Sequence, residues 1–127
     1  LMAQTFIAEP SNERRSTFLA NFRRAYKVER ITVPVAAAQG DDAGYLLAYA
    51  LFTIKNKTID GPAIKHALET NDRPYYGVVT TYKNAFSTTD HNAITMNMLY
   101  LGVVRNGAIT FAYPEDARRN LVVQRKG

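Results

Sequence analysis

The stretch AAAQGDDAGYLLAYAL (residues 36–51) joins small residues and two adjacent aspartates to a long apolar run. Because this run is apolar on nearly every side, it predicts a helix that begins at Gly40–Asp42, extends to about Ile54 and is largely buried. Aspartate is common at the start of a helix, where its side chain accepts hydrogen bonds from free backbone N–H groups. We therefore expect Asp41 and Asp42 to cap this helix, with contact to a ligand as the alternative.

The size and composition of the chain are those of one globular domain. It has 127 residues, of which 46% are hydrophobic and 21% are charged, and this balance argues against disorder. It contains no cysteine, so disulfide bonds and cysteine-based metal sites are excluded. No apolar run reaches the roughly 20 residues that a membrane-spanning helix needs. Leu1 precedes Met2 at the start, which indicates a fragment of a longer protein.

Two further helices are predicted on either side of the opening stretch. Aromatic residues recur at every fourth position between residues 18 and 26, which predicts an amphipathic helix over residues 12–27 with its arginines in solvent. Asp60 and Pro62 are typical of a helix start, as cap and first-turn residue, and predict a helix that ends near Thr70.

Short extended segments fill the rest of the chain. Asn106-Gly107 lies between two runs rich in β-formers, and this dipeptide is the strongest short-range signal for a β-hairpin. Pro34 interrupts a β-branched run and favours an edge strand or an extended loop there. One helical turn is expected at residues 114–120. Strands are expected at residues 2–8, 31–35, 76–82, 98–105, 108–113 and 121–124.

No constellation typical of an enzyme is present in the sequence. There is no nucleophile motif, no glycine-rich phosphate loop, and no His or Glu at metal-ligand spacing from His66 or His91. Asp90-His91 could form an oriented base, but without a nucleophile we expect Asp90 to end a turn and both histidines to be structural or exposed. The sequence therefore predicts no catalysis, no metal and no cofactor.

The net charge of +5 permits a nucleic acid or an acidic surface as a partner. The arginine and lysine residues are spread along the chain, which favours solvated helix faces over a binding patch. A basic nucleic-acid-binding domain rests on charge alone, and a strongly salt-dependent affinity for DNA would support it.

The order of the segments resembles the C-terminal part of the periplasmic binding proteins of the leucine/isoleucine/valine-binding type, the solute receptors of ABC importers. The segments that carry the resemblance are AAAQGDDA before the apolar run, DGPAIKHALE, and GVVTTYKNAFSTTDH followed by the hairpin. The family often has Gly-Tyr-Asp-Ala at residues 40–43. Asp42 therefore matches the family aspartate, and Asp41 replaces a tyrosine.

The resemblance implies an α/β fold, in which three helices pack on short strands of one lobe of a type I periplasmic binding protein and a C-terminal β-hairpin follows. Within a single fragment, residues 1–8 would be a hinge-crossing strand, residues 9–95 the second half of the first lobe, and residues 96–127 a hinge-crossing strand, hairpin and tail. Each lobe of such a protein is a parallel sheet flanked by helices, and solute is trapped between two lobes that close about a hinge. A fragment of this kind would expose much apolar surface, so we expect self-association.

The resemblance also implies the function of a solute receptor for amino acids or related small carboxylates and amides, in the periplasm or outside the cell. Its partners would be the solute and the membrane permease of an ABC importer, without nucleic acid. The loop before the second helix lies at the family's cleft, which makes Ala37, Ala38, Gln39 and Asp42 the candidate ligand contacts and Asp41 chiefly a cap. Asp42→Ala would then weaken binding more than Asp41→Ala. A ligand-sensing module of a receptor or regulator with the same fold is the alternative.

Overall fold

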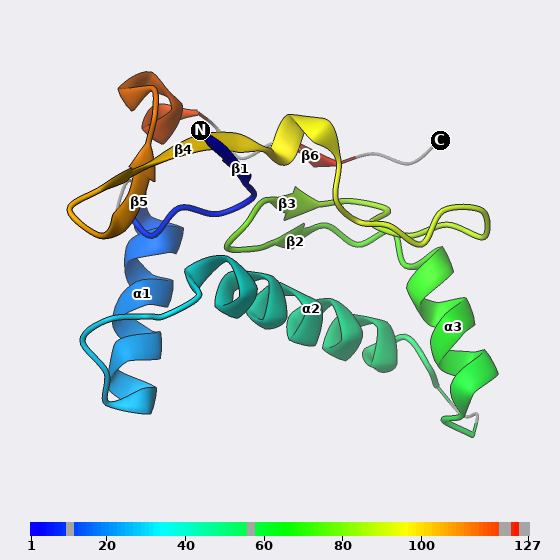
Figure 1. Cartoon of the computed structure of the whole chain (residues 1–127). Coiled ribbons are helices and arrows are strands. Elements are labelled where there is room, and N and C mark those ends of the chain that lie inside the picture. Colours follow the sequence, from blue (N-terminus) through cyan, green and yellow to red (C-terminus); the bar gives the residue numbers. More distant parts are fainter. Residues whose placement is uncertain (10–11, 56–57, 120–122, 125–127) are drawn as a thin grey trace.

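The computed structural model describes residues 1–9, 12–55, 58–119 and 123–124 of the chain. These residues form a mixed α/β fold of three α-helices and two three-stranded sheets. In Figure 1 the longest helix, α2 (Pro34–Phe52), runs beneath the two sheets, and α1 (Glu13–Tyr26) and α3 (Gly61–Thr70) stand near its two ends. The expected α/β class is confirmed.

The first helix forms where the sequence predicts it. Asn12 caps α1 by accepting a hydrogen bond from the backbone N–H of Arg15 at 3.0 Å. The helix ends at Lys27, which adopts the left-handed conformation at φ 54° and donates its N–H to the carbonyl of Arg23. Phe18 and Leu19 are buried, as the aromatic periodicity requires.

Arg15 is a correction to the expected solvated face of α1. Its side chain is only 1% exposed, and its guanidinium lies 5.0 Å from the ring centroid of Tyr100 and 5.3 Å from that of Phe111. Arg15 stands four residues before Leu19, so it shares the buried face of the helix. Rings at these distances stabilise a desolvated cation through their negative faces.

The second helix begins six residues earlier than expected. Pro34 occupies its first turn, where the missing N–H costs nothing and the fixed φ already suits a helix. The edge strand considered for residues 31–35 is therefore absent: residues 31–33 form a loop, as the alternative had it, and residues 34–35 already belong to α2. Asp41 and Asp42 lie inside α2 and do not cap it.

The expectation that the second helix is largely buried is also wrong. Only Ala38, Asp42 and Ala50 are buried on α2, whereas Tyr45 is 53% exposed and Phe52 is 74% exposed. This apolar surface agrees with the expected self-association, which stays a prediction. No helix of the described residues is long and apolar enough to cross a membrane.

The third helix agrees with the prediction at both ends. The Asp60 side chain accepts a hydrogen bond from the N–H of Ala63 at 2.9 Å, and Pro62 lies in the first turn. The helix ends at Thr70.

One sheet is antiparallel throughout, in the order β1-β4-β5. Asn106 and Gly107 join its two longer strands with φ values of 50° and 76°, the left-handed pair that a two-residue hairpin turn requires. The predicted hairpin is confirmed, although its first strand starts two residues late because a 3₁₀-helix (Met96–Met98) precedes it. The strands are β1 (Met2–Gln4), β4 (Tyr100–Arg105) and β5 (Ala108–Phe111).

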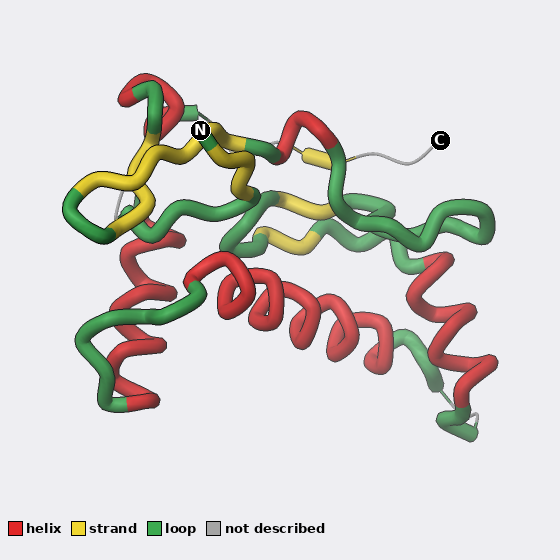
Figure 2. The backbone as a smooth tube through the Cα atoms, viewed as in Figure 1, coloured by secondary structure: helices red, strands yellow, loops and turns green. Residues whose placement is uncertain are grey.

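The other sheet has the order β2-β3-β6 (Figure 2). The single strand expected at residues 76–82 is two short strands, because the N–H of Gly77 donates to the carbonyl of Thr80 at 2.9 Å and closes a tight turn. Pairing within the sheet is antiparallel for β2–β3 and parallel for β3–β6. Its strands are β2 (Tyr75–Tyr76), β3 (Thr81–Tyr82) and β6 (Val123–Gln124).

The C-terminal segment and the core complete the fold. The helical turn expected at residues 114–120 is a 3₁₀-helix (Pro114–Arg118), and residues 121–122 of the expected last strand lie outside the described residues. The main core joins α1, α2 and the β2–β3 turn. Its buried residues are Phe6, Phe18, Leu19, Ile31, Ala38, Val78, Val79, Tyr82, Ala85 and Met98.

Candidate functional site

The two aspartates of the opening stretch have different surroundings. Asp42 is 1% exposed. One carboxylate oxygen accepts the backbone N–H of Val78 at 2.7 Å, and the other accepts the N–H of Val79 at 2.9 Å and the hydroxyl of Tyr82 at 3.0 Å. Burial raises the pKa of Asp42, and the three hydrogen bonds, which favour the ionised form, oppose that rise. The Asp42 carboxylate thus ties α2 to the β2–β3 turn.

Tyrosine rings stack beside this carboxylate. The Tyr75 ring lies 6.1 Å from that of Tyr82, and Tyr45 of α2 stacks on Tyr75 at 5.7 Å. Burial and, next, the negative charge of Asp42 raise the pKa of both Tyr75 and Tyr82 above the ordinary 10.0. Tyr75 and Tyr82 therefore keep their hydroxyl protons to a higher pH than an ordinary tyrosine does.

The raised tyrosine pKa values predict unfolding in alkali. A tyrosine whose pKa rises on folding adds stability that is fully present below its ordinary pKa of 10.0 and is lost as pH rises through the folded-state pKa. We expect circular dichroism to report unfolding above that ordinary value, in step with a late component of tyrosinate absorbance. The double substitution Tyr75→Phe and Tyr82→Phe should remove this loss of stability at alkaline pH. If the double variant unfolds at the same alkaline pH as the unsubstituted protein, ionisation of these two tyrosines is not the cause of the unfolding.

Asp41 faces an open groove of about 790 Å³ between α1 and α2. Its side chain is half-buried, and no donor among the described residues bonds to its carboxylate. Burial raises its pKa. The other residues that line the groove are Glu13, Arg14, Thr17, Phe18, Asn21, Phe22, Ala25, Tyr26, Ala36, Ala37, Gly40, Tyr45 and Val78.

Arg14 brings a positive charge to the same groove. Its Nη1 donates to the carbonyl of Gly77 at 3.2 Å and to the hydroxyl of Thr81 at 3.1 Å, and its guanidinium lies 5.3 Å from the Tyr76 ring centroid. These contacts fix the side chain on one wall of the groove. A carboxylate and a guanidinium therefore line the same groove.

The four predicted contact residues do not meet in one cavity. Ala37 lines the α1–α2 groove, whereas Ala38 and Asp42 are buried in the fold. Gln39 lies on the other flank of α2, where its amide nitrogen donates to the hydroxyl of Thr5 at 2.8 Å. The residues sit on helix turns rather than in a loop, because α2 starts at Pro34.

The position of Asp41 on the groove side of α2 could have been predicted from the sequence. Once Pro34 is taken as the first helical position, Ala37, Gly40 and Asp41 follow the i, i+3, i+4 spacing of one helix face. The extended interpretation of residues 31–35 hid that spacing.

Both histidines are exposed, as expected of surface residues. His91 contacts Glu69 at 2.7 Å, and Lys65 contacts the same carboxylate oxygen at 2.5 Å. The hydrogen bonds from Lys65 and His91 lower the pKa of Glu69. Asp90 ends a turn as predicted, since its carbonyl accepts the N–H of Ser87 at 2.9 Å. Within the described ranges, no group of three or more acidic, His or Cys side chains could hold a metal ion.

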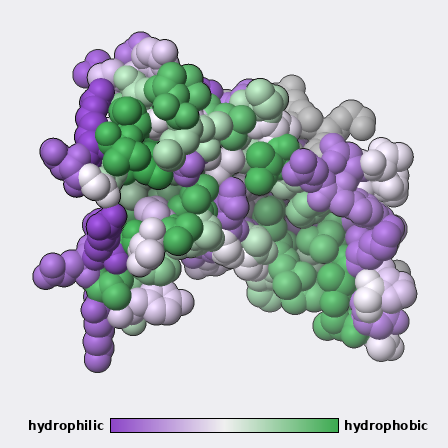
Figure 3. Space-filling model, in the orientation of Figure 1, coloured by the Kyte–Doolittle hydropathy of each residue, from purple (hydrophilic) through white to green (hydrophobic). Residues whose placement is uncertain are grey.

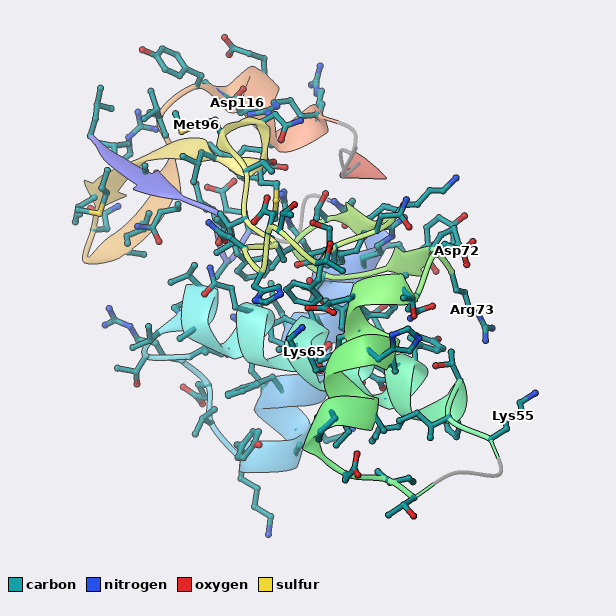
Figure 4. The ribbon with its side chains drawn as sticks, turned by 90° about the vertical axis from the view of Figure 1, so that its right-hand side faces the viewer. Lys55, Lys65, Asp72, Arg73, Met96 and Asp116 are labelled. Carbon is teal, nitrogen blue, oxygen red and sulfur yellow. The ribbon has the colours of Figure 1, made fainter. Side chains whose placement is uncertain are left out.

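Three of the basic residues have quite different surroundings in the described protein. Arg15 is internal, and Arg119 donates to the carbonyls of Leu99 at 3.0 Å and Asn97 at 2.8 Å. Lys55 points away from the body of the protein beyond the end of α2 (Figure 4). This distribution adds no support to the charge-based nucleic-acid alternative.

No protein-family model, no curated protein and no solved structure matches this chain. The resemblance to periplasmic binding proteins therefore stays a prediction.

Proposed function

We propose that the chain is the ligand-binding part of a solute receptor, and that it holds an amino acid or a related small carboxylate or amide in the α1–α2 groove. In this proposal a second lobe closes over the solute about a hinge, and the loaded receptor delivers it to the membrane permease of an ABC importer. The motif resemblance at residues 36–43 and the charged groove over the same residues support it together.

The observation that carries the proposal is the Asp41 carboxylate. This carboxylate lies on the wall of an open groove and accepts no hydrogen bond from the described residues, so its oxygens are available to a donor of a ligand. A ligand ammonium would supply the missing donors and would offset the desolvation that raises the pKa of Asp41.

The rest of the groove fits a zwitterion. Arg14 offers a guanidinium for the carboxylate of the solute, and the rings of Phe22, Tyr26 and Tyr45 offer apolar surface for a side chain. The volume of about 790 Å³ lies within the range of small-molecule sites. Asp41, rather than Asp42, is the ligand contact in this arrangement, because both oxygens of Asp42 already bond to the protein.

We expect Asp41→Asn to weaken the binding of an amino acid about tenfold or more, since it removes a charge-assisted hydrogen bond. Isothermal calorimetry with leucine, phenylalanine and glutamine measures the loss. Binding by the unsubstituted protein should also fade as the pH falls through the raised pKa of Asp41, because the protonated carboxyl no longer attracts an ammonium group. If Asp41→Asn binds the amino acids as tightly as the unsubstituted protein does at every pH, the proposal is contradicted.

A steric pair of variants separates groove filling from unfolding. A Cβ at Gly40 or at Gly44 meets nothing within 4 Å, so both positions of α2 accept a larger side chain. Gly40 lines the groove and Gly44 does not. Gly40→Leu should therefore abolish amino-acid binding, while Gly44→Leu should leave it intact. If no amino acid in the panel binds to the unsubstituted protein, the proposal fails.

A further inference from the structure

A second hollow lies on the opposite flank of α2, between α2, α3, β3 and the segment of residues 86–94. Its volume is about 400 Å³, and Figure 3 shows hydrophobic surface over the neighbouring C-terminal half of α2. The residues that line it are Gln39, Ala43, Leu46, Leu47, Leu68, Tyr82, Phe86, Asn92, Ala93 and Ile94.

The lining of this hollow contains no charged side chain. An ionised ligand would lose part of its hydration there without gaining a counter-charge, which is unfavourable. The hollow therefore selects neutral molecules. This property separates it from the α1–α2 groove, which Asp41 and Arg14 line.

Three polar side chains line the hollow, those of Gln39, Tyr82 and Asn92. The Oδ1 of Asn92 accepts the backbone N–H of Ile94 at 3.0 Å. The amide nitrogen of Gln39 donates to Thr5, and no described residue donates to its amide oxygen. The hydroxyl of Tyr82 is already bonded to Asp42. The hollow thus offers a hydrogen-bond acceptor at Gln39, among leucine side chains and the rings of Tyr82 and Phe86.

We propose that this hollow binds a small, neutral aromatic molecule that carries one N–H or O–H donor. The flat ring packs between the leucines of α2 and the rings of Tyr82 and Phe86, and the donor bonds to the amide oxygen of Gln39. The volume of about 400 Å³ lies within the range of small-molecule sites and leaves room for a bicyclic ring such as indole. The proposal does not depend on amino-acid binding in the α1–α2 groove.

Indole is the probe for the test, because the chain contains no tryptophan and excitation beyond the absorption band of its eight tyrosines selects the fluorescence of indole. We expect its emission to shift to the blue and its anisotropy to rise with added protein. Toluene, which lacks the donor, should compete about tenfold less well, as expected for the loss of one hydrogen bond. Benzoate should not compete at all.

Two exposed positions on α2 supply the variants. Ala43 lines the hollow and Ala36 does not, so Ala43→Leu should weaken indole binding at least tenfold while Ala36→Leu leaves it unchanged. Leu47 is 41% exposed, and Leu47→Glu is a second variant that places a charge at the hollow without filling the core. Circular dichroism checks that each variant folds.

Three results would overturn the proposal: no indole binding to the unsubstituted protein at millimolar concentration, unchanged binding in folded Leu47→Glu, or competition by benzoate as strong as that of toluene. Gly40→Leu, which blocks the α1–α2 groove, should bind indole normally. Loss of amino-acid binding and loss of indole binding are thereby told apart.

Discussion

Asp42→Ala is expected to lower the free energy of unfolding by about 3 to 5 kcal/mol, the cost typical of removing one partner from a buried, charged hydrogen-bond network. The substitution leaves the N–H groups of Val78 and Val79 buried without the acceptor that they have now. It also removes the bond from the hydroxyl of Tyr82. Chemical denaturation followed by circular dichroism measures the change.

Asp41→Ala is the matched control for this prediction. It alters the neighbouring residue of the same helix, whose carboxylate has no described hydrogen-bond donor, and should change stability by only about 0.5 kcal/mol. Asp42→Asn keeps the shape but turns an NH₂ group toward a backbone N–H, so its loss should be intermediate. Equal effects of Asp41→Ala and Asp42→Ala would show that the Asp42 network does not hold the β2–β3 turn in place.

Gly77→Ala is expected to cost about 3 kcal/mol, at the upper end for overpacking of a core. A Cβ at this position would lie 2.6 Å from one carboxylate oxygen of Asp42 and 2.8 Å from the other. Neither side can yield easily, because the carboxylate is held by three hydrogen bonds and Gly77 closes the turn through the carbonyl of Thr80. Denaturant titration measures the loss.

A double-mutant cycle tests the cause of that loss. In the background of Asp42→Ala the obstructing carboxylate is absent, so Gly77→Ala should cost less than about 1 kcal/mol there. Sodium sulfate, which strengthens apolar burial, keeps the weakened variants folded during the measurement. Gly44→Ala is the control: its Cβ meets nothing within 4 Å, and it should stabilise α2 by about 0.5 to 1 kcal/mol. Strict additivity of the two core substitutions would rule out the steric contact as the cause.

The elements that the sequence predicted well are those whose signals act over a few residues. Asn12 and Asp60 each cap their helix by accepting an N–H three residues ahead. Asn106-Gly107 closes its hairpin through its own left-handed φ values. The start of α2 was missed because Pro34 suits both a first helical turn and an extended segment, and the β-branched neighbours favoured the latter.

The candidate site was predicted less well, since its residues depend on what packs beside the helix. Local chemistry assigned Asp41 to a cap and the resemblance assigned Asp42 to a ligand. Neither residue caps α2; Asp41 lines the groove, and the oxygens of Asp42 bond to the β2–β3 turn and to Tyr82. Ala37 was expected at a ligand and does line the groove, whereas Gln39 lies on the other flank of α2.

By itself, the sequence determined the α/β class, three helices apart from the start of α2, the hairpin and the presence of two aspartates in an apolar helix. Only the tertiary structure decided which aspartate is internal. The partners of Asp42 lie 36 to 40 residues further along the chain, in and beside the β2–β3 turn. No local sequence pattern predicted that turn. Hydrogen bonds between residues a few positions apart can be predicted from the local sequence. A carboxylate that bonds to a distant segment cannot be assigned its partners from local sequence, because those partners are brought to it only when the two segments pack together.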